Sequence, residues 1–133
     1  KVTDLNLSGE SQEWRNNCTF EDIFKCENLE SLELSRNYTI QKLPPEIGNL
    51  QQLHTFKMNG GSLKHLPDEF CNLKNLEILE LSYQSLLTLP KNIGKLHNLK
   101  RVSLYWNTYL KRIPKSFTEL QNLSSLFGSD SNG

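Results

Sequence analysis

A pattern that recurs every 23 to 27 residues constrains this chain more than any other feature of its sequence. Four of its six copies run on into a second shared pattern: LPPEIGNL, LPDEFCNL, LPKNIGKL and IPKSFTEL. Chance does not keep two patterns in phase through consecutive copies, so this period predicts a stack of similar units. The first pattern, LxxLxL, starts at Val2, Leu29, Leu53, Leu76, Leu99 and Leu123.

Within one unit, the spacing of the apolar residues predicts a strand followed by a short helical turn. Leu32 and Leu34 alternate with polar neighbours in the second unit, which is typical of a half-buried strand. The Leu-Pro dipeptide that follows favours the first turn of a helix, because proline fixes φ and lacks an amide N–H. Ile47 and Leu50 then lie three residues apart and face one way. One unit cannot bury this apolar side alone, so neighbouring units have to stack.

The composition fits such a repeat and argues against several classes of protein. Half of the 48 apolar residues are leucine, and alanine is absent. The 15 basic and 15 acidic side chains cancel, so we expect neither nucleic-acid binding nor steering of a partner by a bulk field. No apolar stretch approaches the roughly 20 residues of a membrane helix, so we expect no membrane insertion. KVTDLNLSGE lacks the layout of a signal peptide, and we expect that any such segment was removed or never present.

The two patterns together resemble the leucine-rich repeat of the 23-residue class, LxxLxLxxNxLxxLPxxIxxLxx, strongly over 28–123 and loosely over 1–27. The resemblance implies an α/β solenoid: an arc with a parallel β-sheet on its concave side and short helical or 3₁₀ turns on its convex side. The motif LPxxIGxLxxL is most similar to the motifs of bacterial repeat proteins, notably spirochaetal ones, and of Ras-group and plant repeat proteins. The resemblance also implies a function in binding other proteins.

We expect a single repeat domain whose two ends are irregular. Phe20, Ile23 and Phe24 lie at helical spacing in the first unit and predict a longer convex helix there. Open solenoids need capped ends. Either the chain is a piece of a longer protein, or the irregular unit and the polar tail serve as caps. Within 1–133 the expected parts are the irregular unit (1–28), four regular repeats (29–122) and a truncated repeat with a tail (123–133).

The ninth repeat position predicts a partial ladder of asparagine side chains. Asn37 and Asn107 occupy it in two units, where a short amide can bond backbone groups of adjacent turns. Glu10, Gly61 and Gln84 occupy it in the other units. We therefore expect the ladder to be broken at these three positions.

Histidine and cysteine form no catalytic or metal-binding pattern. The period places no Ser or Cys nucleophile beside a histidine. An odd number of cysteines without a spacing pattern favours free thiols, with a Cys18–Cys26 bridge left open as an alternative. Cys26 takes a leucine slot and is predicted to be buried, and Cys71 is predicted to be a semi-buried filler. The residues concerned are His54, His65, His97, Cys18, Cys26 and Cys71.

Carboxylates do not indicate an enzyme either. Glu33 and Glu80 could suggest a pair for glycoside chemistry. They share a column of the sheet with Lys57 between them, which favours a cross-strand charge ladder. We therefore predict no catalytic residue, no metal site and no cofactor.

The outward residues of the strands are the predicted binding surface. Parallel strands stack about 4.8 Å apart, so each repeat position forms a column across the concave face. We expect the third, fifth, seventh and eighth positions to face outward. These columns are small and polar in the N-terminal half and aromatic in the C-terminal half. The predicted protein-binding residues are Ile78, Glu80, Tyr83, Arg101, Tyr105, Trp106 and Phe127.

The sequence thus predicts a non-catalytic module that binds another protein through its concave face, because exposed Tyr, Trp and Arg dominate binding hot spots. One alternative is that the aromatic residues only cover the end of the solenoid. Others are the recognition part of a larger enzyme, effector or receptor, and a surface adhesin. A host protein is one option for the partner. We expect a bacterial protein that is secreted or on the cell surface with its signal removed, with the cytoplasm second.

Overall fold

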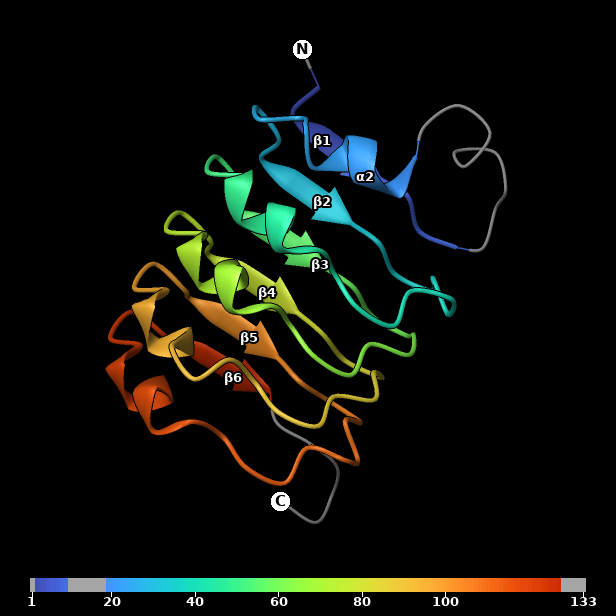
Figure 1. Ribbon diagram of the computed structural model, residues 1–133. Helices are drawn as coiled ribbons and strands as arrows, with labels where there is room; N and C mark the ends of the chain where they lie inside the picture. The colour runs from blue at the N-terminus through green and yellow to red at the C-terminus, as the bar shows by residue number, and fades with distance from the viewer. Residues whose placement is uncertain (1, 10–18, 128–133) are drawn as a thin grey trace.

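The structure is a computed structural model that describes residues 2–9 and 19–127. Within these residues, each unit contributes one three-residue strand to a parallel sheet in chain order. Figure 1 shows the units stacked from the N-terminus to the C-terminus, with the short helices in a second layer. The strands are β1 (Asp4–Asn6), β2 (Ser31–Glu33), β3 (Thr55–Lys57), β4 (Ile78–Glu80), β5 (Arg101–Ser103) and β6 (Ser125–Phe127).

The strand register confirms the period read from the sequence. Leu32 at the fourth repeat position pairs with Phe56, and both side chains are fully buried. Glu33 at the fifth position pairs with Lys57 in an outward row. The same positions pair across every neighbouring pair of strands. The third and fifth positions therefore form continuous columns on one face of the sheet.

On the other side of the core, each regular unit forms the predicted helical turn as a 3₁₀ helix (Figure 1). A proline with an extended backbone precedes three of the four helices, as at Pro44 with φ −75° and ψ 157°. Ile47 and Leu50 point from the first helix into the core and are fully buried. The 3₁₀ helices are η1 (Pro45–Asn49), η2 (Asp68–Asn72), η3 (Ile93–Lys95) and η4 (Lys115–Glu119).

Neighbouring 3₁₀ helices approach so closely that two units need glycine at the same repeat position. A Cβ atom on Gly94 would collide with the backbone carbonyl of Ser116, and one on Gly48 would lie 2.7 Å from a backbone oxygen of η2. The Ser116 hydroxyl accepts from the Gly94 amide at 3.0 Å and donates to the Lys91 carbonyl at 2.7 Å. These contacts join the fourth unit to the fifth.

Side-chain amides satisfy the buried carbonyl groups at the sixth repeat position. Asn37 Nδ2 donates to the Leu7 carbonyl of the first unit at 2.9 Å and to the Leu34 carbonyl of its own unit at 2.8 Å. Asn107 makes the equivalent pair of bonds between the fourth and fifth units. The predicted ladder is therefore present at both asparagines.

The predicted break at Gln84 is wrong, because its longer side chain spans the gap that Gly61 leaves. Gln84 Nε2 donates to the Met58 carbonyl of the third unit at 2.6 Å, and Gln84 Oε1 accepts from the Leu63 amide at 2.8 Å. A Cβ atom on Gly61 would lie 2.9 Å from Gln84 Oε1. The glycine and the glutamine thus form one complementary pair.

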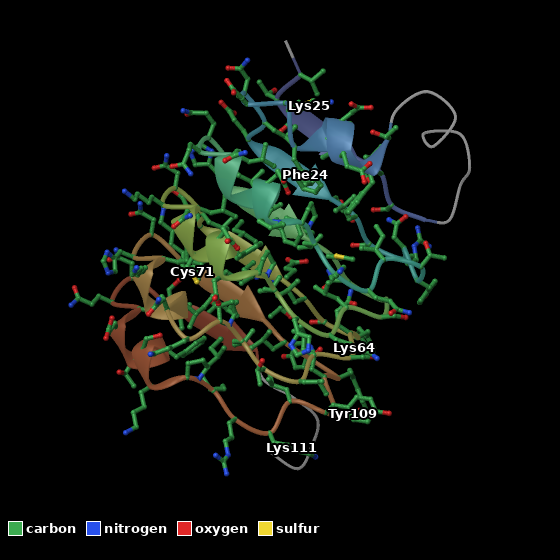
Figure 2. The ribbon with its side chains drawn as sticks, in the orientation of Figure 1. Phe24, Lys25, Lys64, Cys71, Tyr109 and Lys111 are labelled. Carbon is green, nitrogen blue, oxygen red and sulfur yellow. The ribbon has the colours of Figure 1, made fainter. Side chains whose placement is uncertain are left out.

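In the described residues, the predicted longer helix of the first unit is the single turn α2 (Phe20–Ile23). Thr19 and Asp22 form a capping box, with Thr19 N donating to Asp22 Oδ2 at 2.9 Å. The hydrogen bonds from Thr19 hold the pKa of Asp22 below its usual value. Phe24 follows the helix and is buried in the core (Figure 2). Residues 10–18 lie outside the described part of the chain.

Candidate binding surface

The eighth residue of each described unit leaves the strand with a left-handed backbone. The φ angle is +90° at Gly9, +60° at Arg36, +77° at Gly60, +58° at Tyr83 and +56° at Trp106. Glycine adopts this conformation freely, whereas it costs other residues about 1–2 kcal/mol because Cβ crowds the following carbonyl oxygen. The fourth and fifth units therefore keep large aromatic residues where the backbone favours glycine.

These two aromatic residues form an exposed stacked pair. The ring centroids of Tyr83 and Trp106 lie 6.2 Å apart with an interplanar angle of 17°. The two residues are 58% and 50% exposed, so most of their apolar surface is not used by the core. Backbone strain that packing does not require is typical of functional positions. The pair is the strongest structural feature of the concave C-terminal half, and Tyr105 beside it is also exposed.

A depression of about 350 Å³, lined by hydrogen-bonded polar residues and by the tyrosine rings, adjoins the aromatic pair. Glu80 on its wall accepts from Asn59 Nδ2 at 2.9 Å. The Ser82 hydroxyl lies 2.7 Å from that of Ser103 and accepts from the Tyr105 amide at 3.1 Å. These bonds fix the polar groups before any partner arrives. The lining residues are Asn59, Glu80, Ser82, Tyr83, Arg101, Ser103 and Tyr105.

The predicted binding residues lie on one face, with different degrees of exposure. Ile78 and Glu80 are half-buried, and the Glu80 carboxylate lies 3.9 Å from the Lys57 ammonium. This ion pair confirms one step of the predicted charge ladder. Phe127 ends β6, but its side chain lies outside what the structure describes. The exposed predicted residues are Tyr83, Arg101, Tyr105 and Trp106.

The seventh repeat position does not form the outward column that the sequence predicts. Ser35 and Ser82 are buried, at 6% and 5% exposure. Their hydroxyls accept hydrogen bonds from the amides of the next unit, from Asn59 N and Tyr105 N respectively. These serines therefore bind neighbouring units together, and only larger residues such as Tyr105 emerge from the column.

Two exposed tyrosines were missed by the sequence reasoning. Tyr38 and Tyr109 are 51% and 60% exposed, and each belongs to one of the two 24-residue regular units. Tyr38 extends over the third unit, since a Cβ atom on Gly60 would lie 3.6 Å from its hydroxyl. Tyr109 lies on a loop at the lower edge of Figure 2. The extra residue of each unit, next to an aromatic residue, is the signal that could have found them.

Two of the three cysteines lie in the described part of the chain. Cys26 and Cys71 are free thiols, and Cys18 lies outside the described residues. Cys26 is half-buried rather than buried, because the first unit is irregular, and its Sγ donates to the Asp22 carbonyl at 3.7 Å. Cys71 belongs to η2 and is buried (Figure 2), and desolvation raises the pKa of its thiol to about 11.

Within residues 2–9 and 19–127, no group of three His, Cys, Asp or Glu side chains could hold a metal ion. The same part of the chain contains no helix that is long and apolar enough to cross a membrane.

A family model for the leucine-rich repeat region matches residues 2–127. The chain belongs to the leucine-rich-repeat family. Leucine-rich-repeat domains typically bind other proteins and are not catalytic. No curated protein sequence matches the chain.

Solved structures with the same fold come from bacteria and plants. A leucine-rich-repeat protein of Leptospira interrogans has 30% identity and a TM-score of 0.78, covering 98% of this chain and 33% of that protein. The plant peptide hormone receptor RGFR1, in complex with RGF2, has 28% identity and a TM-score of 0.71, covering 82% and 18%. PEPR1 in complex with AtPEP1 has 31% identity and a TM-score of 0.68, covering 79% and 15%. This leucine-rich-repeat chain thus spans a third or less of each of these proteins.

Proposed function

We infer that this chain is a protein-binding module that holds a segment of its partner against the C-terminal half of the concave face. The observation that carries this inference is the stacked pair of Tyr83 and Trp106, which is exposed and has a left-handed backbone. Large aromatic side chains provide apolar contact area at a low entropic cost, which is why they dominate binding hot spots. This backbone conformation does not itself call for an aromatic residue, since Gly9, Arg36 and Gly60 adopt it in the other units.

The surroundings of the pair suit a segment with mixed chemistry. Arg101 projects from β5 and can bind a carboxylate of the partner. The depression offers the hydroxyls of Ser82 and Ser103 and the carboxylate of Glu80. Because hydrogen bonds already order these groups, little side-chain entropy is lost on binding.

The relatives support binding of a peptide segment in particular. RGFR1 and PEPR1 were both solved with a bound partner, RGF2 and AtPEP1. This chain spans only 18% and 15% of those proteins. The second candidate is the recognition part of a larger receptor or effector, because RGFR1 is itself a receptor. The Leptospira relative supports a bacterial source. We propose a secreted or cell-surface location, for which an adhesin is a further form of the same activity.

The test is a selection of partner peptides from a display library, followed by binding measurements with Trp106→Ala and Tyr105→Ala. We expect each substitution to weaken binding of the selected peptides by about ten-fold or more, because truncation of a hot-spot residue costs about 2 kcal/mol or more. The melting temperature should change little, since both side chains are at least 40% exposed.

The matched control is Arg36→Ala, which changes the same repeat position in the N-terminal half. It should leave binding unchanged. Equal weakening by Arg36→Ala and Trp106→Ala, or unfolding of the two aromatic variants, would contradict the proposal.

A further inference from the structure

The stretch 81–118, from the loop after β4 to η4, is strongly cationic although the whole chain is neutral. Residues 81–118 contain seven basic side chains and no acidic one, while 13 of the 15 carboxylates precede residue 81. Such a separation of charge creates a local positive potential that attracts anionic partners. The net charge of zero therefore hides an uneven distribution of charge along the chain.

Three of these cations surround a groove of about 640 Å³ between the fourth and fifth units. It is formed by the segments that lead into η3 and η4, away from the strand columns that carry the proposed concave site. Lys91, Arg112 and Lys115 are exposed, and no carboxylate within residues 2–9 and 19–127 pairs with them. We define the basic groove by Leu89, Lys91, Arg112, Ile113, Pro114 and Lys115.

The floor of the basic groove is apolar. Leu89 and Ile113 occupy the same repeat position, but Leu89 is 6% exposed and Ile113 is 48% exposed. Pro114 beside them is half-buried. An apolar side chain from outside could cover Ile113 and remove it from water, which is favourable in proportion to the area buried.

The basic groove is formed in advance by contacts between its two walls. Ser116 accepts a hydrogen bond from the Gly94 amide and donates one to the Lys91 carbonyl. The close approach at Gly94 leaves no room for a Cβ atom, so the walls are held at a fixed spacing. Lys111, on the adjacent loop in Figure 2, turns towards the Thr108 carbonyl at 3.1 Å and does not line the basic groove.

We propose that the basic groove binds an acidic segment of a partner protein. One apolar side chain of that segment packs on Ile113 and Pro114, and flanking carboxylates pair with Lys91, Arg112 and Lys115. Charge complementarity carries this assignment, because the groove offers three cations and no carboxylate. A nucleic acid would leave Ile113 without an apolar partner. A bilayer surface is too flat to enter a recess between two units.

The test uses a display library of acidic peptides with a randomised apolar centre. We expect selected peptides to bind the wild-type chain and to lose about ten-fold or more in affinity on Arg112→Glu with Lys115→Glu. Affinity should also fall as the salt concentration rises from about 50 to about 300 mM, because exposed charge pairs are screened. Ile113→Ser should remove the preference for an apolar centre over serine.

Two control variants distinguish binding in the basic groove from nonspecific charge attraction and from binding on the concave face. Lys95→Glu removes a cation of the same stretch that does not line the groove, and Trp106→Gly alters the concave face; both should leave peptide affinity within about two-fold. Equal loss on Lys95→Glu would show nonspecific attraction, and loss on Trp106→Gly would place the acidic segment on the concave face. Failure to select any peptide, or equal binding of single-stranded DNA or of phosphatidylserine vesicles, would also overturn the proposal.

Discussion

At the scale of single residues, the stability of the stack depends on pairs from neighbouring units. Gln84 occupies the repeat position that asparagine holds in two other units. Its longer side chain fits because Gly61 of the third unit leaves space for its amide. The backbone of Gly61 has no positive φ that would itself demand glycine. The side chain of the next unit, and not the turn geometry, therefore explains this glycine.

Replacing Gln84 with Ala should lower the free energy of unfolding by about 2–5 kcal/mol. The Met58 carbonyl and the Leu63 amide would both lose their buried partner, and each such loss costs about 1–3 kcal/mol. Urea unfolding monitored by circular dichroism measures the change. Gln121→Ala, in an exposed residue, is the control and should stay within about 0.5 kcal/mol. A loss below 1 kcal/mol for Gln84→Ala would contradict the ladder.

Cys71 should react slowly with iodoacetamide in the folded protein and rapidly in urea. Burial raises the pKa of its thiol from 9.0 to about 11, so the folded state retains the proton that the unfolded state loses. Stability should therefore fall as the pH rises from about 9 to about 11. Alkylation followed by mass spectrometry of the Cys71 peptide checks this. Alkylation at equal rates in both states would contradict it.

At the scale of elements, the close packing of 3₁₀ helices explains why these segments stay short and regular. Gly94 contacts the η4 backbone so closely that Ser116 can bond both its amide and the Lys91 carbonyl. The Leu-Pro or Ile-Pro signature sets where three of the four 3₁₀ helices start, and the buried face of each helix fixes its orientation on the core.

Gly94→Ala should lower the free energy of unfolding by about 1–3 kcal/mol, because the new methyl group overpacks against the Ser116 carbonyl. The control is Lys95→Ala in the same helix, whose exposed side chain should be nearly neutral. Denaturant titration of both variants gives the comparison. Equal stabilities would mean that η3 and η4 separate easily.

The strands and helical turns could be predicted from the repeat because its recurring apolar positions are the residues that are buried in the core. The strand register, the 3₁₀ turns and the buried leucine slots all follow from which residues must face inward. The sequence reasoning failed where a side chain acts across units, as with Gln84, Ser35 and Ser82, because such contacts depend on reach and not on period. The left-handed backbone at Tyr83 could not be predicted either, since only two of the five units in which this position is described have glycine there.

At the scale of the whole molecule, the fold is a one-dimensional stack in which each unit contacts only its neighbours. Stability in such a stack is a sum of unit and interface terms, so the ends are held by one interface and the centre by two. Leu126 in β6 is 47% exposed, whereas the equivalent residues Leu79 and Val102 are buried. The last unit is therefore the weakest described part of the sheet.

Amide hydrogen exchange should show this gradient. We expect protection to be highest in β3 and β4 and at least about ten-fold lower in β6, because local opening at an end breaks fewer contacts. Exchange followed by mass spectrometry or NMR measures it strand by strand. Uniform protection across the six strands would indicate a single cooperative unit instead.

We propose that Trp106 is kept for contact with a partner and not for the fold. The most direct measurement is the free energy of unfolding of Trp106→Gly, with the affinity for a selected partner peptide measured on the same sample. Glycine removes about 1–2 kcal/mol of left-handed strain, while the loss of the stacked Tyr83 ring costs about 0.5–1.5 kcal/mol. We predict that stability changes by less than about 1 kcal/mol and that binding is lost. A variant that loses more than about 2 kcal/mol of stability, or that still binds the peptide, would contradict the account.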